Sequence, residues 1–246
     1  MVFLVKFSGM AIAILADIHG NLEALEAVLK DIEEKGGVEG VWCLGDIVGY
    51  GPDPHLCLER LRGLNPLCVA GNHDWAAIGQ MDLATFNPHA AAAARWTAAH
   101  LTPEDMEYLR GFLTIQAADA FTLVHGSPRE PVWEDVLGPE EARENFSCFP
   151  TRICLVGHSH IPILFEENGK ARSLPERLPL GKERLILNPG AVGQPRDGDP
   201  RASYAIYDGA GVMSHFRVTY DFPTTQKKMA EKGLPPALAY RLKFGW

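Results

Sequence analysis

Five short stretches of the chain place histidine, aspartate or asparagine directly after an apolar run. In open α/β sheets, ligands bind beyond the carboxyl ends of the strands, so such stretches are expected to converge on one cleft. Five of the nine histidines fall in these stretches, which random placement would not favour. The stretches are Asp17-Ile18-His19, Gly45-Asp46, Gly71-Asn72-His73-Asp74, His125-Gly126 and Gly157-His158-Ser159-His160.

The donor atoms in these stretches are oxygen and nitrogen, without a thiolate. Seven candidate ligands are too many for one tetrahedral ion, and they suit two ions that share one carboxylate. Two ions roughly 3.5–4 Å apart hold the attacking and leaving oxygens of a phosphoryl displacement and generate a hydroxide nucleophile. The pattern therefore predicts a two-metal site for phosphoryl transfer. The candidate ligands are Asp17, His19, Asp46, Asn72, His125, His158 and His160.

The spacing inside two of the stretches supports this interpretation. Alternate residues of an extended segment point the same way, so Asp17 and His19 are expected to hold one ion together. His158 and His160 repeat this arrangement. Glycines next to the candidate ligands let the backbone turn sharply and approach closely; they are Gly45, Gly71, Gly126 and Gly157.

The elements that must position these residues change character along the chain. The first half alternates apolar strands with amphipathic helices, which predicts a parallel sheet. Its strands are expected at 10–16, 38–44 and 67–70, and its helices after Asn21 and at 54–61, 88–100 and 103–111. The second half has short strands between Gly, Pro and Asn, which predicts a second, more antiparallel sheet. Those strands are expected at 112–116, 119–124, 152–156, 161–166, 184–187, 203–208 and 212–218, with one helix at 139–147.

Length and composition favour one α/β domain. The 246 residues contain 46% apolar side chains and no linker rich in Pro, Gly or Ser. We expect one domain over 1–246, with its core at about 10–220 and two short helices in a tail at about 222–246. The tail is expected to dock on its own domain or on a second subunit as a homodimer. Residues 1–9 fit either an extra strand or an extension from an upstream start codon.

Net charge and cysteine content argue against several classes of protein. A net charge of −8 argues against a general nucleic-acid binder, which would show a basic face. Five cysteines without a CxxC pair argue against a disulfide scaffold or a structural zinc site. No window offers some 18 uninterrupted apolar residues, so we expect a cytoplasmic protein without membrane association.

The ordered set D-x-H, G-D, G-N-H-D, H-G and G-H-S-H resembles the calcineurin-like metallophosphoesterase family. Each block is weak alone, but the ordered set over residues 17–160 is highly specific. The segment LNPGAVGQPRDGDPRASYAIYD, residues 187–208, resembles the small bacterial phosphodiesterase branch of that family. The resemblance implies a four-layer α/β/β/α sandwich of two mixed sheets with a two-metal site.

The resemblance also implies a role for each ligand. Asp17, His19 and His160 would hold the first ion, and Asp46 would bridge both. Asn72, His125 and His158 would complete the second ion.

Two further residues of the G-N-H-D block would be catalytic. His73 would stay off the metals and contact the substrate phosphate, as transition-state stabiliser or as acid to the leaving group. Asp74 is expected to orient the His73 ring and favour its protonated form, or else to cap the following helix.

Three residues are candidates for substrate contact. Asn21 is expected to cap a helix first and then to assist Asp46 or touch the ligand. Arg129 is a candidate phosphate ligand, because arginine binds phosphate with two parallel hydrogen bonds, or a plain surface residue. Arg196 lies in a loop that either lines the mouth of the cleft or is held in shape by an Asp–Arg pair.

The predicted function is hydrolysis of phosphodiester or dinucleoside polyphosphate bonds by a hydroxide that two metal ions activate. The substrate would be a small phosphate ester or nucleotide. The ligand set admits Mn, Fe, Zn, Co or Ni, with Mn favoured. One alternative is a phosphomonoesterase such as a protein phosphatase, which would place more cationic residues near the metals. The other is a metal-binding interaction protein that uses the same fold without turnover.

Overall fold

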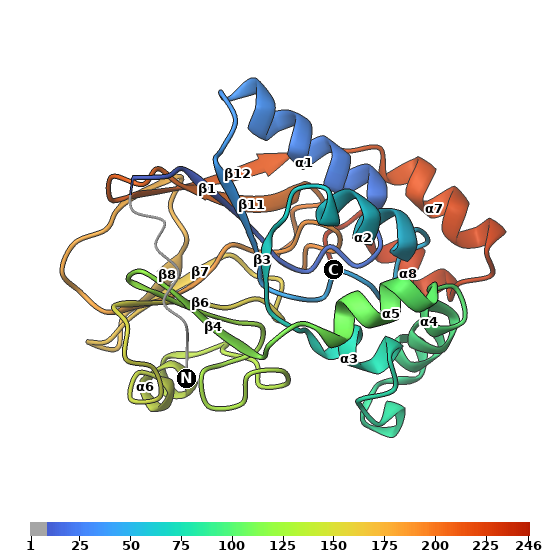
Figure 1. Ribbon diagram of the computed structural model, residues 1–246, viewed down its shortest axis with the longest axis horizontal. Helices are drawn as coiled ribbons and strands as arrows, with labels where there is room; N and C mark the ends of the chain where they lie inside the picture. The colour runs from blue at the N-terminus through green and yellow to red at the C-terminus, as the bar shows by residue number, and fades with distance from the viewer. Residues whose placement is uncertain (1–8) are drawn as a thin grey trace.

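The structure is a computed structural model that describes residues 9–246 (Figure 1). The expectation of an extra strand at 1–9 therefore lies, apart from Gly9, outside the described residues. Two six-stranded mixed sheets form the centre. Sheet I contains, in spatial order, β3 (Leu67–Cys68), β2 (Gly40–Cys43), β1 (Ile12–Leu15), β11 (Ala202–Tyr207), β12 (Val212–Val218) and β9 (Arg177–Pro179). Sheet II contains β4 (Ile115–Ala118), β5 (Phe121–Val124), β6 (Ile153–Leu155), β10 (Leu185–Asn188), β7 (Ile163–Glu166) and β8 (Ala171–Ser173).

Helices lie outside both sheets. Figure 1 shows α1 and α7 on one side of the molecule and α6 on the opposite side, beyond sheet II. The helices are α1 (Leu22–Glu34), α2 (Pro54–Arg62), α3 (Asn72–Ala77), α4 (Pro88–Ala98), α5 (Pro103–Arg110), α6 (Pro139–Asn145), α7 (Phe222–Glu231) and α8 (Pro236–Arg241), with a 3-10 turn at Leu83–Thr85. This is the expected α/β/β/α arrangement.

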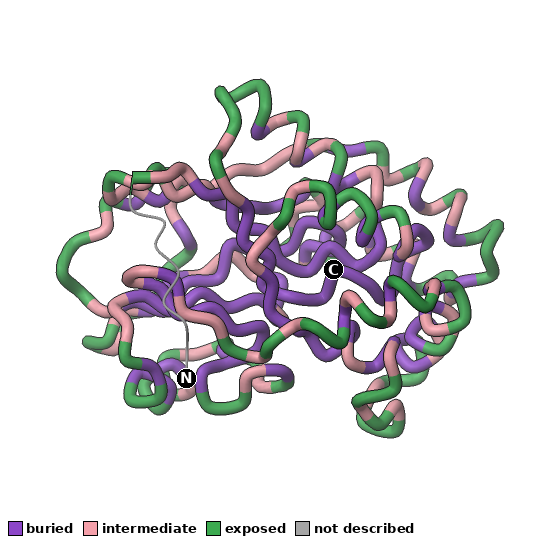
Figure 2. The backbone as a smooth tube through the Cα atoms, viewed as in Figure 1, coloured by how far each residue is buried: buried purple, intermediate pink, exposed green. Residues whose placement is uncertain are grey.

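Alternation along the strands produces these layers, because successive strand residues point to opposite faces. On β1, Ala13 and Leu15 pack in the cluster that contains Leu25 of α1. The residues between them, Ile12 and Ile14, pack toward sheet II in a second cluster. Figure 2 shows the strands buried at the centre and the outer faces of the helices exposed.

The expected division of strands between the sheets is partly wrong. β1, β2 and β3 pair in parallel as predicted. However, β11, β12 and β9 of the second half join sheet I, because β11 pairs antiparallel with β1. Strand periodicity indicates which face of a strand is buried but not which strand lies beside it, and this pairing is decided only in three dimensions.

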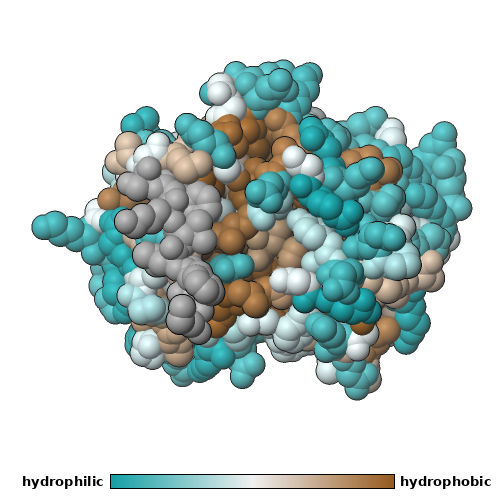
Figure 3. Space-filling view, viewed as in Figure 1, coloured by the Kyte–Doolittle hydropathy of each residue, from teal (hydrophilic) through white to brown (hydrophobic). Residues whose placement is uncertain are grey.

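Boundaries also differ at the strand ends that carry the polar residues. The third strand, expected over 67–70, is only Leu67–Cys68, and helix α3 begins directly at Asn72. Beyond β3, Val69 bridges to Leu113, so the edges of the two sheets meet there. On the face of the molecule seen in Figure 3, apolar residues reach the surface near the middle.

The C-terminal tail packs against earlier parts of the chain, which was one of the two arrangements expected for it. Leu238 and Leu242 of the α8 region pack with Met229 of α7 against Tyr50 and Ala93. The tail also breaks between its two helices where predicted. The homodimer stays a prediction. Within residues 9–246, no helix has the length and apolarity that crossing a membrane requires.

Candidate active site

The seven predicted metal ligands come together, and both sheets contribute them. Sheet I supplies Asp17 and His19 after β1, Asp46 after β2 and Asn72 at the start of α3. Sheet II supplies His125 after β5, and His158 and His160 after β6. All seven are buried except His158, whose side chain is 14% exposed.

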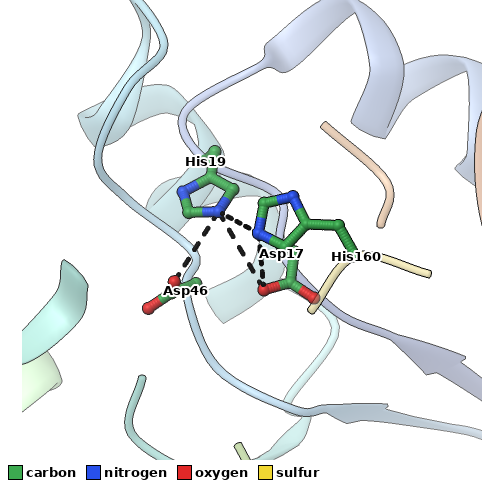
Figure 4. Close-up of side chains that lie close together, drawn as sticks. All are labelled: Asp17, His19, Asp46 and His160. Atoms are coloured by element: carbon green, nitrogen blue, oxygen red, sulfur yellow. Dashed lines mark hydrogen bonds and ion pairs between the residues drawn. The ribbon is translucent and has the colours of Figure 1, made fainter. Parts of the chain in front are cut away.

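The first group of donor atoms comprises Asp17, His19, Asp46 and His160 (Figure 4). The Nε2 atoms of His19 and His160 face each other at 3.1 Å. Asp17 Oδ1 lies 3.3 Å from His160 Nε2 and 3.9 Å from His19 Nε2. These donor atoms lie within 4.8 Å of one another, so one ion can reach them all.

The second group comprises Asp46, His125 and His158, also within 4.8 Å. Asn72 joins it, because its Oδ1 lies 3.1 Å from His125 Nε2. Asp46 belongs to both groups, since its Oδ2 lies 3.6 Å from His19 Nε2 and 3.3 Å from His125 Nε2. A carboxylate in this position can bridge two ions.

The backbone brings these side chains together in a different way from the one expected. The two Asp-x-His and His-x-His stretches are not extended, because four of their residues have positive φ: Asp17 54°, His19 51°, His158 63° and His160 61°. Asp46 has φ 53° as well. Left-handed backbone costs energy in non-glycine residues and gathers at functional sites. The expectation that alternate residues share a face of an extended segment was therefore wrong, although Asp17 and His19 do converge on one group of donor atoms, whereas His158 and His160 belong to different groups.

Glycine is required where two of these loops touch. A Cβ on Gly71 would lie 2.0 Å from Asp46 Oδ1, and one on Gly45 would lie 2.7 Å from the backbone nitrogen of Gly71. The loops after β2 and β3 therefore approach as closely as the sequence analysis expected of these glycines.

Three of the histidines are oriented by backbone carbonyls. The Nδ1 atoms of His19, His125 and His160 lie 3.2, 2.8 and 2.5 Å from the carbonyl oxygens of Val48, Leu44 and Gln194. A ring that donates Nδ1–H to a carbonyl has its lone pair on Nε2, which is the arrangement of a metal-binding histidine. In all three cases Nε2 faces the cluster of donor atoms.

The protonation chemistry of the cluster fits a bound cation. Among residues 9–246, Asp17 Oδ2 and Asp46 Oδ2 are buried without a hydrogen-bond partner. Burial raises the pKa of Asp17 well above its usual value. Burial also disfavours a charged His125, but Asp46 outweighs this and raises the pKa of His125 to about 9. Without metal, the Asp17 carboxyl and the His125 ring would therefore hold protons. A bound cation would replace these protons and neutralise the deprotonated ligands.

His73 lies beside the cluster and in neither group of donor atoms. Its backbone N–H donates to Asp46 Oδ1 at 2.8 Å, and its buried ring nitrogen Nδ1 has no partner. The ring lies 4.2 Å from the Tyr50 ring and lines the cleft. Burial lowers the pKa of His73 to about 4, and Asp46 is the carboxylate that opposes this effect.

Asp74 does not have the expected role of orienting His73. Its carboxylate accepts hydrogen bonds from the backbone N–H groups of Asp46, Ile47, Val48 and Gly71 at 2.8, 2.9, 3.2 and 3.0 Å. The alternative expectation, a helix cap, agrees better with the structure, because the hydrogen bond from Gly71 to Asp74 caps α3. Asp74 thus fixes the loop that carries Asp46, and it reaches His73 only through the backbone.

Two of the three candidates for substrate contact have other roles within the described residues. Asn21 is buried; it caps α1 through Ala24 N and donates to the carbonyl of Gly193. Arg129 forms ion pairs with Glu134 and Glu144 and does not line the cleft. The helix cap expected first for Asn21 is confirmed, and Arg129 fits its alternative interpretation as a surface arginine.

Arg196 does line the cleft. The loop that carries it is also held by charge pairs, since Asp197 pairs with Arg217 and Asp199 with Arg201. Both expectations for this loop therefore hold in part.

The cleft above the cluster has a volume of about 190 Å³ and includes residues that the sequence analysis did not select. Tyr50, Phe86 and Trp133 line it, and Arg241 of α8 lies behind Tyr50 with its guanidinium 5.5 Å from that ring. Aromatic residues in the loops at 50, 86 and 133, outside any strand, were an available signal for the first three. Nothing local marks Arg241, because only tertiary docking brings the tail beside Tyr50.

Comparison with known proteins agrees with this architecture. Residues 10–210 match the model of the calcineurin-like phosphoesterase superfamily domain. The crystal structure of a metallophosphoesterase from Sphaerobacter thermophilus is 45% identical, with a TM-score of 0.88 over 97% of this chain and 100% of that one.

Curated relatives are similar over most of their length as well. An uncharacterised protein of Methanocaldococcus jannaschii is 38% identical over 95% of this chain and 98% of its own. The phosphodiesterase YfcE of Escherichia coli is 30% identical over 81% of this chain and 88% of its own. This chain belongs to the calcineurin-like phosphoesterase superfamily, whose members are metal-dependent hydrolases of phosphate esters.

Proposed function

We propose that this chain is a phosphodiesterase or dinucleoside polyphosphate hydrolase that uses two divalent transition-metal ions. The observation that carries the proposal is the position of Asp46, whose Oδ2 lies 3.6 Å from His19 Nε2 in one group of donor atoms and 3.3 Å from His125 Nε2 in the other. The similarity to a phosphodiesterase over most of the chain supports the diester part.

The proposal assigns seven residues as metal ligands and one residue to contact the substrate. Asp17, His19 and His160 would hold one ion, and Asn72, His125 and His158 the other, with Asp46 shared. Ions bound there supply Lewis acidity to the phosphoryl group and lower the pKa of a water molecule. We favour manganese, although this mixed oxygen and nitrogen set also admits Fe, Zn, Co and Ni.

His73 is the residue that would contact the scissile phosphate. Its ring lines the cleft, and its Nδ1 has no other partner. In the neutral ring one nitrogen carries a proton that it can donate to a phosphoryl oxygen or to the leaving group. The bond from its backbone N–H to Asp46 fixes the distance between His73 and the metal ligands.

A second function, phosphomonoester hydrolysis, is favoured by one observation. A phosphomonoesterase is expected to have more cationic residues near the metals, and both Arg196 and Arg241 approach Tyr50 at the edge of the cleft. Arginine binds the dianion of a monoester as readily as any other phosphate.

A screen of phosphate esters in the presence of Mn²⁺ tests the proposal. We expect hydrolysis of bis(p-nitrophenyl) phosphate and of dinucleoside polyphosphates, with a lower kcat/KM for p-nitrophenyl phosphate. A higher kcat/KM for the monoester would move the assignment to a phosphomonoesterase. An absence of turnover with every ester and every candidate metal would contradict the proposal and favour a binding protein.

A further inference from the structure

The cleft has two chemically different ends. Arg196 marks the first, and its backbone N–H donates to the carbonyl of His160 at 3.4 Å. Trp133 marks the second, with its ring centroid 6.1 Å from that of His158. His160 belongs to the first group of metal ligands and His158 to the second. The two ends therefore lie beside different halves of the metal-ligand cluster.

A continuous wall of rings joins the two ends. The Tyr50 ring lies 4.2 Å from His73, His73 lies 5.1 Å from Phe86, and Phe86 lies 5.2 Å from Trp133. The residue proposed to contact the scissile phosphate, His73, is thus near the middle of this wall. A phosphate over the metal ligands would have the arginine on one side and the two aromatic rings on the other.

The arginine end holds a cation without an ion-pair partner among residues 9–246. In the described part of the chain, the hydrogen bonds of Arg196 Nη2 go to Tyr50 Oη at 3.5 Å and Gln194 Oε1 at 3.3 Å. Its Nε is buried without a partner. Within residues 9–246, no aspartate or glutamate lies at ion-pair distance from this guanidinium. Partial burial of a cation without an anionic partner is unfavourable, and a bound anion would reduce this cost.

A second arginine reinforces this charge. Arg241 Nη1 donates to the same Gln194 Oε1 at 3.1 Å, and the two guanidinium groups lie 5.9 and 5.5 Å from the Tyr50 ring centroid. Burial lowers the pKa of Arg241, and the nearby charge of Arg196 lowers it further. The fold therefore places two like charges together at one end of the cleft, which an anion between them and the metal centre would stabilise.

We propose that Arg196, supported by Arg241, binds a second phosphate group of the substrate, and that Phe86 and Trp133 stack on its nucleobase. The inference rests on the proposed function, because the first phosphate is the one over the metal ligands. It narrows the substrate class to nucleotides with at least two consecutive phosphates. Trp133 is 42% exposed, as a ring available for stacking on a ligand would be.

The reaction on such a substrate is hydrolysis of a phosphoanhydride. Water forms a new bond to the phosphorus over the metal ligands, and the bond from that phosphorus to the bridging oxygen breaks. The bridging oxygen leaves with the phosphate held by Arg196, and the two protons of water pass to the new terminal phosphates or to solvent. No oxidant or reductant is needed.

Calorimetric titration of the Mn²⁺-loaded protein with three probes tests the two ends separately. The probes are orthophosphate, pyrophosphate and ADP, the last two with a methylene group in place of the bridging oxygen so that they bind without being hydrolysed, each with saturating Mn²⁺ in both solutions. In Arg196→Gln we expect the Kd for pyrophosphate and for ADP to rise by about tenfold to a hundredfold, the usual effect of a lost charged hydrogen bond. Orthophosphate binding should not change, because this probe reaches only the metal ligands.

Trp133→Ala should show the complementary pattern. We expect its Kd for ADP to rise by about fivefold to a hundredfold, the usual effect of a lost stacking partner, and its Kd for pyrophosphate to stay unchanged. Arg196→Lys keeps the charge and should restore part of the pyrophosphate binding. Arg172→Gln and Trp246→Ala are matched controls, because both side chains are exposed and neither lines the cleft.

The outcomes separate this inference from the proposed function. If Arg196→Gln weakens orthophosphate as much as pyrophosphate, the arginine holds the phosphate over the metals, and the second-phosphate site is overturned. If Trp133→Ala leaves ADP binding unchanged, the stacking role is overturned. These binding results do not depend on turnover, whereas failure of the wild-type protein to hydrolyse any ester contradicts the proposed function alone.

Discussion

The two carboxylate oxygens of Asp46 make different contacts. Oδ1 accepts the backbone N–H of His73, and Oδ2 faces His19 on one side and His125 on the other. Gly71 must be a glycine because a Cβ there would collide with Oδ1. The position of this one side chain therefore couples the metal ligands to the residue proposed to contact the phosphate.

Asp46→Asn should release metal as well as activity. The amide presents only one oxygen and carries no charge, so it cannot bridge two cations as a carboxylate does. We expect elemental analysis to find at most one ion per chain, with hydrolysis of bis(p-nitrophenyl) phosphate abolished. Asp208→Asn is the control, because that residue lies in a distant turn where asparagine serves equally well. An unchanged metal content in Asp46→Asn would rule out the bridge.

His73→Ala should separate catalysis from metal binding. The ring lies in neither group of donor atoms, so metal content should remain that of the wild type. Loss of an acid or a hydrogen-bond donor to the transition state should reduce kcat by about 10²- to 10⁴-fold. Elemental analysis and steady-state kinetics on the same preparation measure both quantities, with His100→Ala as the exposed control. A near-normal kcat would remove His73 from the mechanism.

Among the elements, the loop between β5 and α6 has its own anchor. This loop carries Trp133. Glu134 fixes the loop by accepting hydrogen bonds from Ser127, Arg129 and Asn145. Partial burial favours a proton on Glu134, but Arg129 and Asn145 outweigh this and lower the pKa of Glu134 to about 2. The ionised carboxylate therefore stabilises the folded loop.

Glu134→Gln should change the pH dependence of stability. A carboxyl whose pKa is lowered by folding stabilises the protein above its ordinary pKa of 4.5, and this contribution is lost as the pH falls toward about 2. At pH 7 we expect the variant to have a free energy of unfolding about 1 kcal/mol below that of the wild type. The difference should shrink between pH 4.5 and 2.

Urea unfolding of both proteins across this pH range measures the effect. Loss of metal in acid affects both proteins, so only the difference between them is interpreted. Glu107→Gln is the control, since its side chain is 81% exposed. A difference that stays constant from pH 7 to 3 would show that Glu134 contributes through packing and not through its charge.

For the whole molecule, the proposed metal centre would connect the two sheets, because both supply its candidate ligands. Sheet I brings Asp17, His19, Asp46 and Asn72, whereas sheet II brings His125, His158 and His160. Ions bound only by the folded arrangement stabilise it by mass action. The buried carboxylates and histidines would otherwise keep protons or unpaired charge.

Removal of metal should therefore lower the thermal stability of the whole domain. At a free metal concentration of about 100 times Kd the stabilisation is about 2.7 kcal/mol, which corresponds to roughly 5–10 °C in Tm for a chain of this size. Scanning calorimetry with chelator and with added Mn²⁺ measures the shift. Asp46→Asn should show little response to Mn²⁺, and an identical Tm of the wild type with and without metal would contradict a metal centre that joins the sheets.

Much of this molecule was predictable because its signals are local. Apolar strands that end in polar residues identified all seven candidate ligands, and Gly233 to Pro236 marked the break between the tail helices. The signals failed where a contact is made across the fold. Asp74 was assigned to His73 because it is the next residue, whereas its carboxylate binds the loop after β2. Arg129 was assigned to the cleft because it follows His125 closely, but two glutamates hold it elsewhere.

By itself, the sequence determined which side chains gather at the strand ends and that their chemistry suits phosphoryl transfer. Periodicity and residue type are properties of a few consecutive residues, so they are readable without a fold. Only the tertiary structure decided that β11 lies beside β1, that left-handed backbone turns Asp17 and His19 toward one point, and that Arg241 stands next to Arg196. Those features arise from contacts between distant segments, whose geometry is fixed only when the whole chain packs.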